Sequence, residues 1–582
     1  MRVVHVLPDV SGLDREFSYL SSAATDADLG IGDRVRVPLH GRIVAGWVIG
    51  FGDPPSDRCD PDTLVVDQLK EISSRSGVGP SADVVDLSAW AAWRWAGRRR
   101  AFLAAGSPPK VVPVVPGERF STSRPEPRSP ATTELLDGGG GVLRLPPNDD
   151  VMASIASALA VGPVLVVTPS VREATMLAGR LRRARCSVAV IPDEWAAARG
   201  GVDVVIGPRG AVWAPCPKMA SALVVDEHDE ALQSEASPTW HAREVLAERC
   251  RRLEVPMVLI SPCPSPEALH TRTLRRPPAE REIRSWPTVR IVDRAANEQQ
   301  PSSSLLTSAL IEHLRTPGRR VLCVLNVKGR SRLSACRACR TLARCEVCET
   351  AVTVDDRSVM VCPQCATQRP GVCVACGASA FALLRPGVAR LREELEAAAA
   401  RPVAQVDATG DSIDDAAEIH IGTEALLTRR SIADVVAFLD FDQELAAPRF
   451  RAPEHAMALI VRAGRIVGPR HRGGEVLVQT HLVDHEVLRA ASIGDPGMLA
   501  EHSQERRRIL QLPPFSALAE IAGLGMDEFV QSLSLCDGVS VSGDSDRTLL
   551  RADSVEALCD TLASGTRPPR SRLRIAIDPP RL

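Results

Sequence analysis

The sequence predicts an α/β multidomain protein dominated by two parallel-sheet lobes, and three observations support this fold class. The chain has 582 residues, more than one hydrophobic core accommodates. From residue 141 onward, short apolar segments alternate with Ala- and Arg-rich segments, which is typical of parallel strands covered by helices on both faces. Eight cysteines between residues 336 and 376 then interrupt the second set of strands.

Composition and charge exclude several classes of protein. The chain is 45% hydrophobic, as expected of a folded globular protein rather than a disordered one. Its 70 basic and 72 acidic residues give a net charge of −2, which argues against a nucleic-acid binder that relies on total charge alone. The first residues lack the apolar run of a signal peptide, and no uncharged apolar stretch of about 18 residues occurs later. We therefore expect a cytoplasmic protein without a membrane partner.

Residues 1–105 are predicted to form a small, β-rich N-terminal domain. Residues 34–38 alternate with period two, and residues 43–51 form a second strand after the turn at residues 40–42. Residues 83–96 are predicted to be a helix whose Trp90 and Trp93 pack on one face. Residues 106–140 are rich in proline and glycine, which indicates a linker.

The remaining boundaries follow the two sets of apolar strands. The first lobe is expected at residues 141–290, with strands at 142–145, 163–168, 187–191, 203–206, 222–225 and 255–260. The second lobe is expected at residues 291–335 and 379–485, with strands at 321–326, 418–422, 435–440 and 475–480. The cysteine insertion then spans residues 336–378, and residues 486–582 form a C-terminal α/β domain that ends in a strand at 572–577.

The cysteines form four C-x-x-C pairs, the spacing at which two thiolates meet one tetrahedral Zn²⁺. The pairs are Cys336/Cys339, Cys345/Cys348, Cys362/Cys365 and Cys373/Cys376. Four pairs predict two Cys₄ zinc sites, whose metals supply the folding free energy of a segment too short to fold alone. Disulfides are disfavoured in the cytoplasm, and the spacing matches neither type of ferredoxin cluster. The spacing leaves sequential, nested and interleaved pairing open, and a purely structural role is the simplest interpretation.

One motif indicates a nucleotide-binding site, and the absence of a second motif argues against it. Asp226 and Glu227 follow the strand at 222–225, and an acidic pair at the carboxyl end of a parallel strand is how motor ATPases hold Mg²⁺. A standard P-loop also requires a lysine within G-K-[ST]. The chain has four lysines, none of them in this context: Lys70, Lys110, Lys218 and Lys328.

Several longer motifs together resemble the PriA family, superfamily 2 DNA helicases of bacterial replication restart. These motifs are R-E-F-S-Y-L (15–20), G-D-R-V-R-V-P (32–38), V-V-I-G-P-R (204–209), V-V-D-E-H-D (224–229), W-H-A-R-E (240–244), I-G-T (421–423), G-E-V-L-V-Q-T-H (474–481), L-P-P-F (512–515) and D-P-P (578–580). The resemblance spans nearly the whole chain. It implies two RecA-like helicase lobes, an N-terminal 3′-DNA-binding domain, and nested zinc pairing. One zinc would take Cys336, Cys339, Cys373 and Cys376, and the other Cys345, Cys348, Cys362 and Cys365.

The chain departs from the family at three motor motifs. Residues 145–150 read L-P-P-N-D-D where the family carries its P-loop, and prolines and carboxylates are poor partners for phosphate. Ser261-Pro262-Cys263-Pro264 replaces S-A-T, and Gly468 replaces the second arginine of G-R-x-G-R. Asp226, Glu227 and Arg465 are therefore expected to be relics, and ATP is a doubtful cofactor.

For DNA binding, the resemblance implies a pocket for a 3′ end at Phe17, Ser18 and the turn with Arg42. Ser18 replaces an acidic residue, and the alternation of Phe17 and Tyr19 is equally typical of a core strand. The basic clusters Arg98-Arg99-Arg100 and Arg506-Arg507-Arg508 suit either phosphate contact or a solvated helix end.

Our hypothesis is a helicase-like scaffold that recognises stalled or abandoned forks and nucleates primosome assembly without helicase activity. The implied partners are forked and single-stranded DNA, the single-strand DNA-binding protein, and other primosome components including the replicative helicase or its loader. One alternative is an active ATP-dependent 3′–5′ DNA helicase with a non-standard nucleotide site. A second is an interaction protein that no longer binds DNA.

Overall fold

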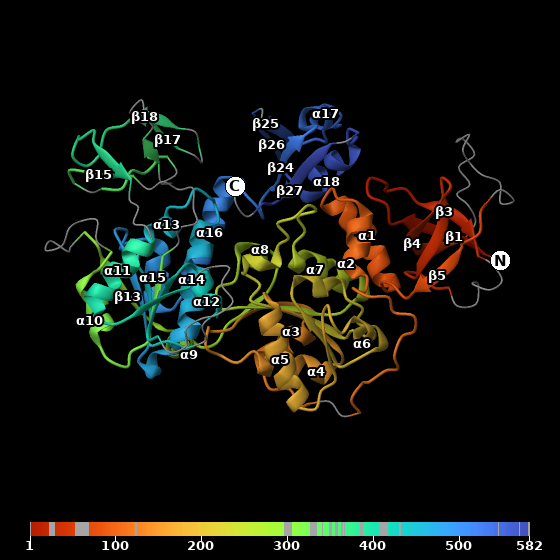
Figure 1. The fold of residues 1–582 in the computed structure, drawn as a ribbon, viewed down its shortest axis with the longest axis horizontal. Coiled ribbons are helices and arrows are strands. Elements are labelled where there is room, and N and C mark those ends of the chain that lie inside the picture. Colours follow the sequence, from red (N-terminus) through yellow and green to blue (C-terminus); the bar gives the residue numbers. More distant parts are fainter. Residues whose placement is uncertain are drawn as a thin grey trace.

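The computed structural model confirms the predicted fold class: antiparallel sheets lie at both ends of the chain and two parallel sheets lie between them (Figure 1). It describes the chain apart from residues 1, 22–28, 53–68, 123–124, 296–304, 326–333, 340, 348–351, 355–358, 363–364, 366, 384–387, 407–416, 430–431, 545, 570 and 580–582. In Figure 1 the two lobes lie side by side. The C-terminal domain lies above them, the N-terminal sheet at the right and the cysteine insertion at the upper left.

The N-terminal domain has a five-stranded antiparallel sheet in the order β2-β1-β4-β3-β5. Its elements are β1 (Val3–Pro8), β2 (Phe17–Leu20), β3 (Arg34–Leu39), β4 (Arg42–Phe51), β5 (Ser74–Gly77), α1 (Ala82–Arg94) and α2 (Arg99–Gly106). The predicted alternation in β3 is confirmed, because Val35 and Val37 are buried while Arg36 is exposed. The predicted helix with Trp90 and Trp93 is α1, which ends at Arg94.

Lobe 1 is a seven-stranded parallel sheet in the order β12-β6-β11-β10-β7-β9-β8. Its strands are β6 (Gly140–Arg144), β7 (Val164–Val167), β8 (Val188–Val190), β9 (Val204–Gly207), β10 (Ser221–Val225), β11 (Met257–Ser261) and β12 (Leu274–Arg275). Its helices are α3 (Pro130–Asp137), α4 (Met152–Val161), α5 (Val171–Arg183), α6 (Trp195–Gly200), α7 (Ala242–Leu253), α8 (Pro266–His270) and α9 (Ala279–Ser285).

Helix α3 lies in the proline-rich segment before lobe 1, where composition predicts only a linker. Ser129 caps α3 by accepting a hydrogen bond from the Thr132 N–H (3.3 Å), and Pro130 occupies the first turn, where its missing N–H is not needed. Leu135 and Leu136 are buried in the core of lobe 1. This packing stabilises a helix of eight residues that is too short to be stable alone.

Lobe 2 is a six-stranded parallel sheet in the order β13-β23-β22-β14-β21-β20. Its strands are β13 (Thr288–Asp293), β14 (Val321–Val324), β20 (Val403–Val406), β21 (Ile419–Gly422), β22 (Val435–Phe438) and β23 (Glu475–Thr480). Its helices are α10 (Ser308–Arg315), α11 (Val388–Ala399), α12 (Ala425–Arg429), α13 (Asp442–Leu445), α14 (Ala452–Val467), α15 (Glu486–Ile493) and α16 (Pro496–Ile509). The insertion carries β15 (Ser334–Cys336), β16 (Thr353–Val354), β17 (Val359–Val361), β18 (Gln368–Pro370) and β19 (Phe381–Leu383).

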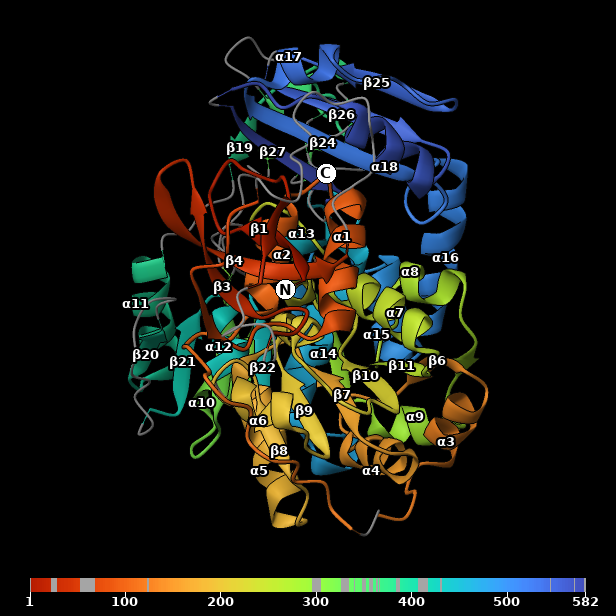
Figure 2. The ribbon, with the colours of Figure 1, turned by 90° about the vertical axis from the view of Figure 1, so that its right-hand side faces the viewer.

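The C-terminal domain has a four-stranded antiparallel sheet in the order β25-β26-β24-β27. Its elements are β24 (Ala517–Leu524), α17 (Met526–Gln531), β25 (Val539–Gly543), β26 (Arg547–Ala552), α18 (Val555–Ser564) and β27 (Arg572–Ile577), the predicted final strand. Figure 2 shows this sheet above the N-terminal domain. Among the described residues, no helix is both long enough and apolar enough to span a bilayer.

One hydrophobic core joins the N-terminal helices, one face of the lobe 1 sheet and the C-terminal domain. Edge-on aromatic contacts run through it, with ring centroids 5.3 Å apart for Trp90 and Trp95 and 5.7 Å apart for Trp213 and Trp240. The predicted packing role of the α1 tryptophans is thereby explained. These three parts are held together by buried apolar contacts, whereas lobes 1 and 2 meet through charged side chains, as described next.

Candidate functional site

The loop at residues 145–150 lies where the first strand of lobe 1 ends, and its polar side chains are engaged by the protein itself. The Asn148 amide donates hydrogen bonds to the carbonyls of Ser285 (3.0 Å) and Gly464 (3.4 Å), the second of which belongs to lobe 2. Asp149 pairs with Arg281 at 2.8 Å, and Asp150 accepts a hydrogen bond from Arg180 at 2.9 Å. The loop therefore presents carboxylates and prolines where a phosphate cradle would need free N–H groups.

Asp226 and Arg465 meet across the two lobes. Asp226 follows β10 with a positive φ of 51°, and Arg465 projects from α14. The contact is bidentate: Nη2 lies 2.6 Å from one carboxylate oxygen and Nη1 bonds the other. Arg465 Nε also donates to the carbonyl of Pro147 at 3.2 Å. Arg465 of lobe 2 thus binds both Asp226 and the loop at residues 145–150 of lobe 1.

Electrostatics around this pair follow from burial and from Arg465. Burial alone would raise the pKa of Asp226, but the Arg465 guanidinium holds it below its ordinary value. Nearby Glu173, on α5, shows the opposite effect. Burial first, and then the charges of Asp226 and Asp229, raise the pKa of Glu173 to about 7. Glu173 therefore titrates near neutral pH, whereas the neighbouring pair of Asp226 and Arg465 stays charged.

Glu227 lines the crevice beside Asp226, but partners from lobe 1 hold its carboxylate. Its carboxylate pairs with Arg243 at 2.9 Å and accepts hydrogen bonds from the backbone N–H (2.6 Å) and hydroxyl (3.0 Å) of Ser265. The residue is 1% exposed. A buried carboxylate that accepts hydrogen bonds from three donors stabilises the loop after β11.

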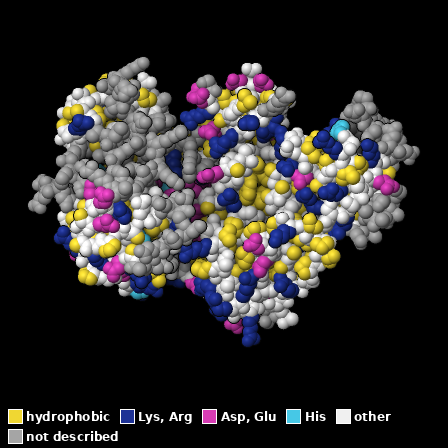
Figure 3. All heavy atoms as spheres, viewed as in Figure 1, with side chains coloured by type: hydrophobic (Ala, Val, Ile, Leu, Met, Phe, Trp, Pro, Cys, Tyr) yellow, Lys and Arg dark blue, Asp and Glu magenta, His cyan; other side chains and the backbone are white. Residues whose placement is uncertain are grey.

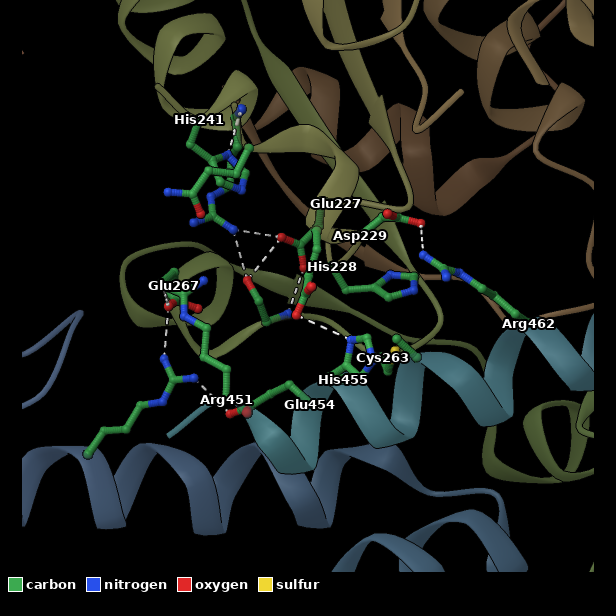
Figure 4. A pocket seen from close by; sticks show the side chains of 16 residues that line it. Glu227, His228, Asp229, His241, Cys263, Glu267, Arg451, Glu454, His455 and Arg462 are labelled. Carbon is green, nitrogen blue, oxygen red and sulfur yellow. Dashed lines mark hydrogen bonds and ion pairs between the residues drawn. The ribbon is translucent and has the colours of Figure 1, made fainter. Parts of the chain in front are cut away.

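Further ion pairs join the lobes beside Asp226 (Figure 4). Asp229 pairs with Arg462 at 2.7 Å, and Glu267 pairs with Arg451 at 2.7 Å. From α16, the buried Arg507 contacts Glu267 of lobe 1 and Glu454 of lobe 2, both at 2.8 Å. Arg507, predicted either to contact phosphate or to be solvated, is therefore an internal clamp. Sequence reasoning missed Arg451 and Arg462, because no motif marks them, whereas their partner Asp229 follows a recognisable strand.

The crevice that remains between the lobes is small. Its volume is about 50 Å³, and charged side chains line most of it. A small-molecule site usually needs about 300–1,000 Å³, whereas a volume near 30 Å³ corresponds to one water molecule. This crevice, which neither Asp226 nor the loop at residues 145–150 lines, is too small for a molecule of nucleotide size.

The cysteines come together as the nested pairing implies. The Sγ atoms of Cys336, Cys339, Cys373 and Cys376 lie within 4.8 Å of one another, and those of Cys345, Cys362 and Cys365 do the same. Cys348, the expected fourth ligand of the second group, lies outside the described residues. Neighbouring sulfurs are 3.4–3.5 Å apart. A tetrahedral ion with bonds of about 2.3 Å requires sulfurs roughly 3.8 Å apart, so both groups could hold a metal ion such as zinc.

The predicted DNA-binding residues lie in different settings. Phe17 is half-buried with the Arg15 guanidinium 5.9 Å from its ring centroid, and the Ser18 hydroxyl is hydrogen-bonded to His5 at 3.1 Å. Arg42 is exposed at the β3–β4 turn. The buried Tyr19 links β2 to β3, because its hydroxyl donates to the Pro38 carbonyl at 3.2 Å.

The two arginines that follow α1 also differ in their exposure to solvent. Arg98 is exposed. Arg99 turns inward, donating to the Val85 carbonyl (3.1 Å) and to the Ser88 hydroxyl (3.0 Å), which anchors α2 to α1. Of the two, only Arg98 presents its guanidinium to solvent.

Comparison with known proteins matches residues 3–107 to a family model described as the PriA 3′ DNA-binding domain. The chain is 24% identical over 364 residues to the replication restart protein PriA of Synechocystis, covering 56% of this chain and 44% of that protein. It is 26% identical to the probable replication restart protein PriA of Mycobacterium leprae over 92% of this chain and 90% of that one. The match to the PriA of Treponema pallidum covers 87% and 84%, at 23% identity.

These relatives confirm the resemblance that the motifs indicate, although the alignments with the first relatives span less than half of those proteins. Solved structures are more distant. Escherichia coli HrpB matches with a TM-score of 0.33 and 13% identity, covering 63% of this chain and 44% of that one. Yeast Dbp5 bound to RNA and ADP BeF3 matches with a TM-score of 0.34 and 12% identity, covering 65% and 91%. TM-scores this low carry no argument about function.

Proposed function

We propose that this chain, a member of the PriA family, recognises stalled or abandoned DNA replication forks and nucleates primosome assembly without helicase activity of its own. The 3′ DNA-binding domain would meet the fork, and the rest of the chain would hold it in place for protein partners. The observation that carries the proposal is the filled crevice: Arg465 pairs with Asp226 where a working motor would bind nucleotide.

Fork recognition is supported by the N-terminal match and by its surroundings. The matched residues 3–107 include the whole N-terminal sheet, α1 and α2. Helix α1 packs on α7 of lobe 1 and on α18 of the C-terminal domain. A DNA-binding domain attached this firmly fixes where a captured strand end lies relative to the rest of the fork.

The lack of motor activity is supported by each element of the nucleotide site. The loop at residues 145–150 has no lysine and carries two prolines and two carboxylates, Glu227 is held by partners of lobe 1, and Arg465 neutralises Asp226. A motor also opens and closes its lobes with each nucleotide. Ion pairs from Asp226, Asp229 and Glu267 to lobe 2 oppose such opening, because each would have to break when the lobes separate.

Two zinc ions complete the proposal, one in each cysteine group, with Cys348 as the fourth ligand of the second. Four thiolates make a closed, structural site with no open position for chemistry. The proposed partners are forked and single-stranded DNA, the single-strand DNA-binding protein, and the replicative helicase or its loader, all in the cytoplasm.

ATP turnover by the full-length, zinc-loaded chain tests the motor part. We expect no hydrolysis above background, with or without forked DNA, and no difference between the natural chain, Asp226→Ala and the control Asp193→Ala, which alters an exposed aspartate of the same lobe. Hydrolysis that forked DNA stimulates and Asp226→Ala abolishes would establish the ATP-dependent helicase instead. Fork binding is measured separately at ~0.15 M salt, where equal affinity for forks and plain duplex would disprove fork recognition.

A further inference from the structure

The junction between the N-terminal and C-terminal domains is close-packed and polar at its rim. Arg94 of α1 is buried and pairs with Glu244 of lobe 1 at 2.6 Å. The Trp93 indole N–H donates to Asp560 of the C-terminal domain at 2.8 Å. These contacts fix the two domains relative to each other, so side chains on either side of the rim keep a constant separation.

Two arginines from different domains lie at the turn that joins α1 and α2 on this rim. Arg567, in the loop before β27, donates from Nη2 to the carbonyl of Ala96, two residues before Arg98 in the turn that joins α1 and α2. Its guanidinium carbon lies 6.0 Å from the centroid of the Phe529 ring, which fixes its direction. Arg98 is exposed, and no hydrogen bond or ion pair engages its guanidinium within the described part of the chain.

The charge balance at the rim is positive. Asp14 is the nearby carboxylate, and it accepts hydrogen bonds from the backbone N–H groups of Arg99 (3.2 Å) and Arg100 (3.5 Å) at the start of α2. Burial and the charge of Arg98 lower the pKa of Arg567, and Asp14 offsets only part of this effect. A guanidinium that experiences the charge of a second cation, only partly offset by Asp14, favours the binding of a further anion.

We propose that Arg98 and Arg567 together bind one phosphate of the DNA backbone, at a site shared by the N-terminal and C-terminal domains. The proposal rests on the proposed function, because DNA is the anion that this chain is inferred to meet. Guanidinium groups bind phosphate through paired N–H donors, and a site between two domains also fixes the orientation of the bound duplex or strand. Figure 3 shows further dark-blue Lys and Arg side chains between the C-terminal domain at the top and the N-terminal domain at the right.

The experiment uses the full-length, zinc-loaded chain and a labelled fork, with affinity measured by anisotropy across a range of salt concentrations. Arg98→Ala and Arg567→Gln are made singly and together, since glutamine keeps a donor for the Ala96 carbonyl. Each single variant should weaken binding about tenfold, the order expected for one charged hydrogen bond, and lower the salt slope by about 0.7–0.9. Because both arginines bind the same phosphate, the double variant should bind the fork less than twofold more weakly than either single variant. Its salt slope should equal that of the single variants.

Arg284→Ala is the matched control, because this arginine has a side chain that is 77% exposed and lies on α9, away from the junction. It should leave affinity and slope unchanged. Unchanged binding by Arg98→Ala would overturn the proposal. It would also be overturned if the affinity losses of the two single variants multiplied in the double variant and its salt slope dropped twice as far, because this result indicates two separate phosphates. Since Arg98 has no internal partner, its variant tests the site even if Arg567→Gln loosens the junction. A natural chain that does not prefer forks would instead disprove the proposed function itself.

Discussion

Removing Arg465 should loosen the closure of the two lobes, because this arginine of lobe 2 pairs with Asp226 of lobe 1. In Arg465→Ala, Asp226 keeps its buried position, with a side chain 5% exposed, but loses both hydrogen bonds of the bidentate contact. Breaking a buried ion pair from one side costs about 3–5 kcal/mol, because the remaining charge stays desolvated. The Arg465 side chain is 36% exposed, so water reaches the site, and we reduce this to about 2–3 kcal/mol.

Hydrogen exchange measured by mass spectrometry gives the local opening free energy directly. A loss of about 2–3 kcal/mol should speed exchange roughly 30- to 150-fold in peptides that cover residues 145–150 and the end of α14. Peptides from the C-terminal sheet should not change. Asp226→Asn should restore much of the protection in the Arg465→Ala background, because a neutral amide replaces the unpaired charge. Less than a threefold change in Arg465→Ala would refute the view that this pair holds the lobes closed.

Three further predictions concern other groups of the same structure. The pKa of Glu173 is raised to about 7 from an ordinary value of 4.5, so the folded chain binds one more proton than the unfolded chain between these pH values. Raising the pH across this window should therefore lower the Tm of the natural chain relative to that of Glu173→Gln. A difference in Tm that stays constant with pH would contradict the shift. Arg507→Ala leaves Glu454 without this ion pair and Glu267 with Arg451 alone, so it should lower the free energy of unfolding in urea by about 2–3 kcal/mol. The exposed neighbour Arg508→Ala should change it by less than about 0.5 kcal/mol, and equal effects of the two variants would disprove the clamp. Cys345→Ser should lower the zinc content from two ions to one by elemental analysis while Cys536→Ser retains two, and two ions in both variants would overturn the assignment.

The local sequence pattern was sufficient to predict several strands and the cysteine groups that could hold metal ions. The period-two alternation at residues 34–38 predicted β3, and the apolar segments at residues 222–225 and 435–440 predicted central strands of the two lobes. Cysteine spacing predicted the thiolate clusters, because a C-x-x-C pair brings two ligands together within a single turn. The same local reasoning exposed the altered phosphate loop at residues 145–150.

The partners of the charged residues were decided only by tertiary structure. Asp226 and Arg465 are 239 positions apart, and no periodicity relates them. Arg99 and Arg507 were predicted from basic runs that suit either DNA or solvent, yet both turn inward to protein acceptors. A run of arginines specifies charge but not direction, because side-chain direction depends on the packing of distant elements. The sequence by itself therefore determined that the phosphate loop is altered and where two metals could bind. The tertiary structure decided that Arg465 pairs with Asp226, because only the meeting of two lobes brings that arginine to the carboxylate.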